Sequence, residues 1–268
     1  MKKYLLLLLV FSATMNTVNA EENSLLQQAI DGKHRSAQNK SRDQYRHPLE
    51  TLNFFDVKPN MSVVEIWPGG KGWYTEILAP YLKENGTFYA AQFSSESKNS
   101  YFTRNLQRFN SKIGAQSAIY GNVIVTVLQP PQFINIAPNN SVNRVLTFRN
   151  VHNWMKNDQT DVVFSAMYDA LKIGGILGVV EHRADENSKQ DPKALSAYVK
   201  ESVVIAFAEK AGFTLIEKSE INANPKDTKD YPKGVWSLPP SLKLKEQDKA
   251  KYIAIGESDR MTLKFIKK

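Results

Sequence analysis

The chain has 268 residues, 42% of them hydrophobic, and a formal net charge of +8 at pH 7. This length suits one large domain with a substantial core, and the charge is too mild to demand nucleic acid as a partner. The chain has no cysteine, which excludes disulfides, and its four histidines show no metal-binding spacing, so we expect no protein metal site.

The first twenty residues have the pattern of a secretory signal peptide. Two lysines precede an apolar run from Leu5 to Phe11, and Val18-Asn19-Ala20 offers the small residues of a cleavage site after Ala20. The run is shorter than the ~20 residues that span a bilayer, although an uncleaved anchor is the alternative. We expect a periplasmic or secreted protein of net charge +6 that keeps no membrane span after cleavage.

Residues 21–60 are predicted to form a helical extension. Ser24 to His47 read as one polar helix, and Leu49 to Phe55 read as a short second helix after Pro48. Arg35, Arg42 and Arg46 in this stretch suit an anionic ligand or a lid over a cofactor, and they equally suit a solvated helix face.

Residues 61–268 alternate strands with helices, which predicts an α/β domain whose parallel sheet has helices on both faces. Helices are expected at Trp73–Lys83, Ser97–Ile113, Asp158–Lys172 and Asp191–Lys210. Strands are expected at Ser62–Ile66, Thr87–Gln92, Val123–Leu128, Val142–Phe148, Ile176–Glu181, Phe213–Ile221 and Arg260–Ile266. No comparable helix joins the last two strands, which leaves an antiparallel last strand open, and periodicity does not fix the strand order.

A long insertion, residues 222–259, separates the last two predicted strands. It carries four prolines and Trp236 and shows no clear helix or strand pattern. A segment of this length inside a compact domain is typical of a functional loop or lid.

The stretch from Val63 to Leu82 carries the strongest functional signal. A β-branched run containing Glu65 is followed by Gly69, Gly70 and Gly72, and then by a helical pattern. A glycine loop between a strand and a helix places backbone N–H groups where α/β sheets bind nucleotide-like cofactors. The alternative is a glycine-rich turn that binds no ligand.

Four segments resemble the class I S-adenosylmethionine-dependent methyltransferases: VVEIWPGGKGWYTEIL, GTFYAAQ, RVLTFRNVHNW and LKIGGILGVVEHR. Their amino-acid sequences are similar to those of a bacterial subgroup of predicted secreted methyltransferases. The resemblance implies a Rossmann-like, doubly wound, seven-stranded and mostly parallel sheet with an antiparallel C-terminal strand. It also implies S-adenosylmethionine as cofactor, with contacts from Glu65, Gly69, Gly70, Gly72, Gln92, Gln129 and Asn150.

The chain departs from that family's pattern at several positions, including Asn143, where an acidic residue is common before strand four. Trp67 stands where the family has its first glycine, and the third glycine is displaced to Gly72. Gln92 and Gln129 stand where acidic residues commonly meet the ribose and the adenine. A glutamine accepts one hydrogen bond and donates one without carrying a charge, so the expected cofactor contacts are altered.

The segment after the fourth predicted strand offers the catalytic candidates. His152 is the candidate general base because an imidazole titrates near neutrality, and Arg149 is the candidate clamp for an anionic substrate. Glu181 and His182 end the fifth predicted strand and would also face the crevice. The alternative is that these side chains only pack their loops.

The sequence thus predicts an S-adenosylmethionine-dependent methyltransferase acting on an unidentified small-molecule or other acceptor. The alternative is a non-catalytic or repurposed ligand-binding protein on the same fold, in keeping with the replaced carboxylates and the predicted export away from a cytoplasmic cofactor. A membrane-surface protein that uses the loop around Trp236 is a third possibility. The oligomeric state cannot be predicted from the sequence.

Overall fold

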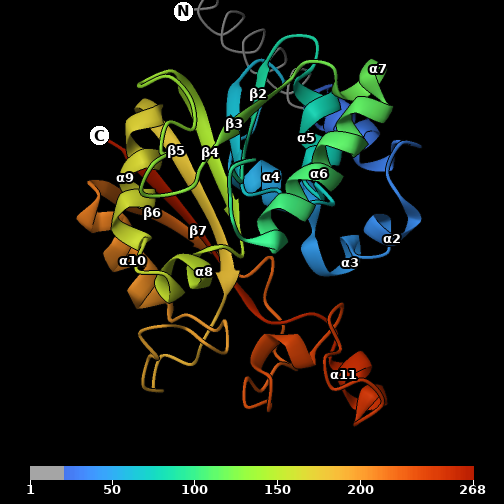
Figure 1. Ribbon diagram of the computed structural model, residues 1–268, viewed down its shortest axis with the longest axis vertical. Helices are drawn as coiled ribbons and strands as arrows, with labels where there is room; N and C mark the ends of the chain where they lie inside the picture. The colour runs from blue at the N-terminus through green and yellow to red at the C-terminus, as the bar shows by residue number, and fades with distance from the viewer. Residues whose placement is uncertain (1–20) are drawn as a thin grey trace, which may run out of the picture.

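A seven-stranded sheet forms the centre of the computed structural model, which describes residues 21–268; the predicted signal peptide lies outside the described residues. The strands lie in the order β3-β2-β1-β4-β5-β7-β6 (Figure 1). Neighbouring strands from β3 to β5 are parallel, whereas β7 runs antiparallel to β5 and β6. The bounds are β1 Ser62–Ile66, β2 Thr87–Gln92, β3 Val123–Val127, β4 Val142–Phe148, β5 Leu171–His182, β6 Phe213–Ser219 and β7 Arg260–Lys267.

The predicted fold class is therefore confirmed, including the antiparallel last strand. The strand order reverses between β1 and β4, because β2 and β3 lie on one side of β1 while β4 and β5 lie on the other. Open α/β sheets bind ligands at such a switch point, at the carboxyl ends of the strands. The candidate residues after β1, β4 and β5 consequently meet at one edge of the sheet.

Helices cover both faces of the sheet (Figure 1). One face carries α4 (Pro48–Phe54), α5 (Thr75–Leu82), α6 (Ser100–Ala115) and α7 (Ser117–Tyr120), and the other carries α8 (Val151–Lys156), α9 (Thr160–Ala170) and α10 (Glu201–Lys210). Two apolar cores result from the alternation of side chains along each strand. Val63 of β1 belongs to the core with α4 to α7, and its neighbour Val64 to the core with α8 to α10.

The N-terminal extension is helical but broken into pieces, so the single predicted helix from Ser24 to His47 is wrong. Residues 21–31 are helical, and α2 (Ala37–Lys40) and α3 (Asp43–Arg46) follow after a turn. Ser36 starts α2 because its hydroxyl accepts a hydrogen bond from the Asn39 N–H. The break places α3 beside the start of β7, since Arg260 donates to the Tyr45 carbonyl.

One further helix prediction fails at its start, and one helix was not predicted. The predicted helix Asp191–Lys210 begins only at Glu201, because the Asp191 carboxylate accepts from the N–H groups of Lys193 and Leu195 and holds a turn instead. Helix α8 was not predicted at all, since its six residues are too few to show a helical period.

The insertion at residues 222–259 is ordered and anchored. It contains a 3₁₀ helix, η1 (Gly234–Ser237), and α11 (Lys249–Ile255). Buried Asp227 accepts hydrogen bonds from the Tyr198 hydroxyl and from the N–H of Asp259, which joins the insertion to the loop before α10. Among the described residues, no helix has the length and apolar character needed to cross a membrane.

Replacing Tyr198 by phenylalanine is expected to lower the free energy of unfolding by about 2 kcal/mol, because Asp227 then lacks its hydroxyl donor and stays buried. Amide hydrogen exchange should also become faster in residues 228–259. Chemical denaturation and exchange mass spectrometry measure both effects. Tyr101→Phe is the control, since the Tyr101 side chain is exposed; equal effects from the two variants would contradict the anchoring role.

Candidate functional site

The loop after β1 turns sharply at the carboxyl edge of the sheet. Trp67, Gly69 and Gly72 all have positive φ angles, of 45°, 67° and 53°. The Trp67 ring nitrogen donates to the Leu128 carbonyl after β3 at 2.8 Å, so the indole lies across the ends of three strands. A side chain at Gly69 would meet no atom within 4 Å, which marks open space beside the loop.

Glu65, near the end of β1, is buried beneath this loop. Its carboxylate accepts a hydrogen bond from the Thr75 hydroxyl at 2.6 Å. Burial raises the pKa of Glu65 to about 7, and the Thr75 hydroxyl and the charge of Arg149 offset this only in part. A cation bound beside Glu65 would stabilise its ionised form.

Gln92 is the last residue of β2, and only one end of its side-chain amide makes a hydrogen bond within the described residues. Its Nε2 donates to the Gly69 carbonyl at 3.1 Å, whereas its buried Oε1 has no hydrogen-bond partner among residues 21–268. Buried polar atoms are rarely left unpaired, so this acceptor needs an explanation. The backbone N–H of Gly70, in contrast, donates to the Asn105 side chain of α6.

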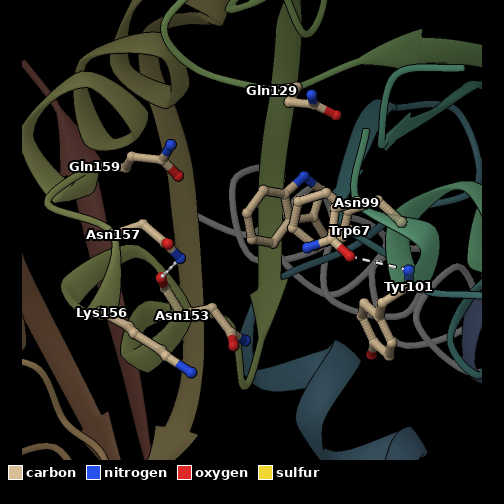
Figure 2. Close-up of a pocket in the computed structure, with 9 residues that line it drawn as sticks. Trp67, Asn99, Tyr101, Gln129, Asn153, Lys156, Asn157 and Gln159 are labelled. Carbon is tan, nitrogen blue, oxygen red and sulfur yellow. Dashed lines mark hydrogen bonds between the residues drawn. The ribbon is translucent and has the colours of Figure 1, made fainter. Parts of the chain in front are cut away.

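A cavity of about 300 Å³ opens between α6 and α8, and we call it the amide cavity (Figure 2). Trp67, Tyr101 and Phe102 supply aromatic walls, while the polar groups are mostly side-chain amides. Gln129 lies at its edge, and its Oε1 accepts from the Ser94 N–H. The full lining is Trp67, Asn99, Tyr101, Phe102, Gln129, Asn153, Lys156, Asn157 and Gln159.

His152, at the start of α8, pairs with Glu181 at the end of β5. The Nδ1 atom of His152 lies 3.0 Å from the Glu181 Oε1, and the carboxylate also accepts from the backbone N–H groups of His152 and His182. A carboxylate that holds Nδ1–H fixes the tautomer in which Nε2 is the basic atom. Glu181 is fully buried, so this histidine–carboxylate pair is rigidly placed.

A second cavity, of about 250 Å³, lies beside this pair, and we call it the arginine cavity. Arg149, which follows β4, lines it together with His182 and Trp236. The centre of the His152 ring lies 5.4 Å from the centre of the His182 ring and 6.3 Å from that of the Trp236 ring. The two predicted catalytic residues, Arg149 and His152, are therefore brought to the same region.

Asn150 does not face an open site. Its side-chain nitrogen donates to the Ile66 carbonyl at 2.9 Å and to the Thr147 hydroxyl, so it fastens the end of β4 to the end of β1. Gly72 likewise packs closely, since a side chain there would lie 3.1 Å from Thr75. Both residues thus shape the carboxyl edge of the sheet, and their predicted contact with a cofactor stays a prediction.

Histidine spacing predicted no metal site, yet the fold gathers three residues of ligand type. Donor atoms of His152, Glu181 and His182 lie within 4.8 Å of one another. Burial, together with the positive charges of Arg260 and Arg149, lowers the pKa of His182 well below its ordinary value. The same positive surroundings disfavour a bound cation, so we interpret the group as a hydrogen-bonded base and its neighbours.

Several site residues could not be found from the sequence. Asn99 and Tyr101 show no motif, and the pairing of Glu181 with His152 joins residues 29 positions apart. Trp236 could be noted as an unusual loop residue, but its place beside His152 depends on the folding of the insertion. Arg260 ends in the site only because β7 inserts beside β5.

No protein-family model and no curated protein matches the sequence. Solved structures do match its shape. A SAM-dependent methyltransferase from Aquifex aeolicus shares 20% identity, covering 68% of this chain and 87% of its own, with a TM-score of 0.52. A putative sarcosine dimethylglycine methyltransferase from Galdieria sulphuraria shares 11% identity over 89% of each chain, with a TM-score of 0.56.

The chain has the fold of the S-adenosylmethionine-dependent methyltransferases. The [4+2]-cyclase SpnF also matches, at 11% identity over 92% of this chain and 93% of its own, with a TM-score of 0.54. At these identities the likeness concerns the fold, and SpnF is a case in which the fold carries another activity. Function must therefore be argued from the site.

Proposed function

We propose that this protein binds S-adenosylmethionine at the ends of β1, β2 and β3 and transfers its methyl group to a small-molecule acceptor at the ends of β4 and β5. The observation that carries the proposal is the buried Oε1 of Gln92, which has no hydrogen-bond partner among residues 21–268. It ends β2, next to the open space at Gly69, where the resembling family binds the ribose. A ribose hydroxyl would supply the missing donor.

The other residues fit the remaining parts of the cofactor. Glu65 would pair with its ammonium group, a charge-assisted contact that would also favour the ionised carboxylate. The aromatic walls at Trp67 and Tyr101 suit an adenine ring, and Gln129 retains its amide N–H groups as donors. Trp67 narrows the crevice because an indole is far larger than the glycine that the family has at this position. The centre of its ring lies 5.0 Å from the centre of the Phe93 ring.

Methyl transfer needs little covalent chemistry from the protein. S-Adenosylmethionine supplies a methyl group on a positively charged sulfur. The residues of this chain position the acceptor and remove its proton: Glu181 holds Nδ1 of His152, which leaves Nε2 to accept a proton from the attacking oxygen or nitrogen. Positioning the two reactants supplies most of the remaining rate gain.

A second candidate function is a ligand-binding protein without catalysis. Trp67 in the crevice and the Gly70 N–H already bonded to Asn105 both favour it. We also propose, from the signal-peptide pattern, that the protein is periplasmic or secreted and belongs with the bacterial secreted subgroup. A protein outside the cytoplasm would need an external supply of cofactor, which favours the binding function.

Calorimetric titration with S-adenosylmethionine and its demethylated product tests the proposal. We expect saturable binding of both, and Gln92→Met should weaken it about tenfold because the ribose loses its buried acceptor. Gln247→Met, at an exposed position of the insertion, is the matched control. Absence of binding at millimolar ligand would contradict the methyltransferase proposal, and equal affinities for wild type and Gln92→Met would remove Gln92 from the ribose site.

A further inference from the structure

The arginine cavity gathers four guanidinium groups from three parts of the chain. Arg42 and Arg46 come from the N-terminal extension, Arg149 from the turn after β4, and Arg260 from the first position of β7. Like charges repel strongly where water is scarce, so such a cluster is costly without a compensating anion.

One carboxylate, that of Glu257, lies in this cluster. Its oxygens contact the guanidinium groups of Arg42, Arg46 and Arg260. Within the described part of the chain, no salt bridge engages Arg149. The arginine cavity therefore keeps an excess of three positive charges.

Several donors in the cluster make no hydrogen bond within the described residues. Arg46 is 3% exposed, and its Nε and Nη1 atoms make no hydrogen bond within residues 21–268. The Nε atom of Arg260 is also buried and makes no hydrogen bond within these residues. The Arg46 guanidinium is held in place by the Trp73 ring, 4.6 Å away. Burial and the charges of Arg260 and Arg42 lower the pKa of Arg149 to about 10, in keeping with an uncompensated positive site.

We propose that the arginine cavity binds the phosphate group of the acceptor substrate, which is thus a small organic phosphate. That the bound phosphate compound is a methyl acceptor rests on the proposed methyl transfer. The anion site itself does not depend on that proposal. An excess of three charges favours a dianion over a single carboxylate, and the planar forks of arginine match phosphate oxygens.

The apolar lining residues of the cavity suit the organic part of this substrate. Val235, Trp236, Pro239 and Pro240 line it with apolar surface. Trp236 also lies beside His152, so a molecule that spans from the arginines to Trp236 would bring its far end toward the proposed base. The phosphate would serve as a fixed handle that orients the attacking atom.

Calorimetric titration of the purified protein with inorganic phosphate, and separately with acetate, tests the site. We expect phosphate to bind at least about tenfold more tightly than acetate, and Arg46→Gln to weaken phosphate binding at least about tenfold. Arg104→Gln, an exposed arginine on α6, is the matched control and should change nothing. Acetate binding as tight as phosphate, or an unchanged affinity in Arg46→Gln, would overturn the proposal.

Two further variants keep the test decisive. If circular dichroism shows that Arg46→Gln is unfolded, Arg46→Lys takes its place. This variant retains the charge but loses the planar guanidinium fork, so it should weaken phosphate binding several-fold. An unchanged phosphate affinity in Arg46→Lys would overturn the assignment. Gln92→Met should keep phosphate binding intact. A protein that binds phosphate but not S-adenosylmethionine would contradict the proposed function and leave the anion site standing.

Discussion

Glu257→Gln is expected to lower the free energy of unfolding at pH 7 by about 3 kcal/mol, because it leaves two buried guanidinium groups and the half-buried one of Arg42 without their carboxylate. Glu257 is 3% exposed, and the loop that carries it leads into β7. Urea denaturation measures the loss. Glu246→Gln is the control, since Glu246 is exposed and pairs only with Lys249; a loss no larger than in this control would contradict the charge cluster.

The effect of Glu257 should depend on pH in one direction. Burial opposes ionisation, but the charges of Arg260, Arg46 and Arg42 outweigh it and hold the pKa of Glu257 well below its usual range. A carboxylate with a depressed folded pKa stabilises the fold above its unfolded pKa, near 4.5, and loses this contribution as the pH falls toward the folded pKa. The difference between wild type and Glu257→Gln should therefore shrink below about pH 4. Added phosphate should partly restore the variant.

Glu65→Gln is expected to raise the free energy of unfolding at pH 8 by about 3 kcal/mol while it weakens S-adenosylmethionine binding. The pKa of Glu65 is about 7 in the fold against 4.5 in the unfolded chain. The unfolded state therefore releases its proton first, and the fold loses stability as the pH rises from 4.5 to 7; below 4.5 the penalty vanishes. Glutamine mimics the protonated acid and escapes the penalty.

The same substitution removes the carboxylate that would pair with the cofactor's ammonium group. Affinity for S-adenosylmethionine should fall about tenfold or more. Denaturation at pH 4 and pH 8, with calorimetric titration beside it, measures both effects, and exposed Glu50→Gln is the control. A variant that is no more stable at pH 8, or that binds as tightly as wild type, would contradict the role given to Glu65.

The local sequence pattern predicted the positions of several strands of the sheet well. The bounds of β1, β2 and β4 match the predicted strands, because β-branched runs bounded by turns carry their own period. Where local side chains compete with helix formation, the pattern misled: Asp191 caps a turn inside a stretch of helical composition. The bounds of β5 also shifted, since Leu171 leaves the preceding helix at once and pairs with Val142.

The site was predictable only where it follows a strand end. Glu65, Gln92, Arg149 and His152 could be placed at one edge because parallel strands end together. Glu181 could be placed there too, but its pairing with His152 could not, and Trp236 and Arg260 arrive through tertiary packing that leaves no local signal. The unpaired state of the Gln92 oxygen is likewise a property of the folded chain alone.

In the function proposed above, the end of β2 binds the ribose of S-adenosylmethionine. A crystal structure of the protein with the demethylated cofactor, S-adenosylhomocysteine, tests it most directly. We predict a ribose hydroxyl within hydrogen-bond distance of the Gln92 Oε1 and the adenine in the amide cavity beside Trp67. A ligand bound elsewhere, or a Gln92 Oε1 that is still without a partner when the ligand is bound, would contradict the account.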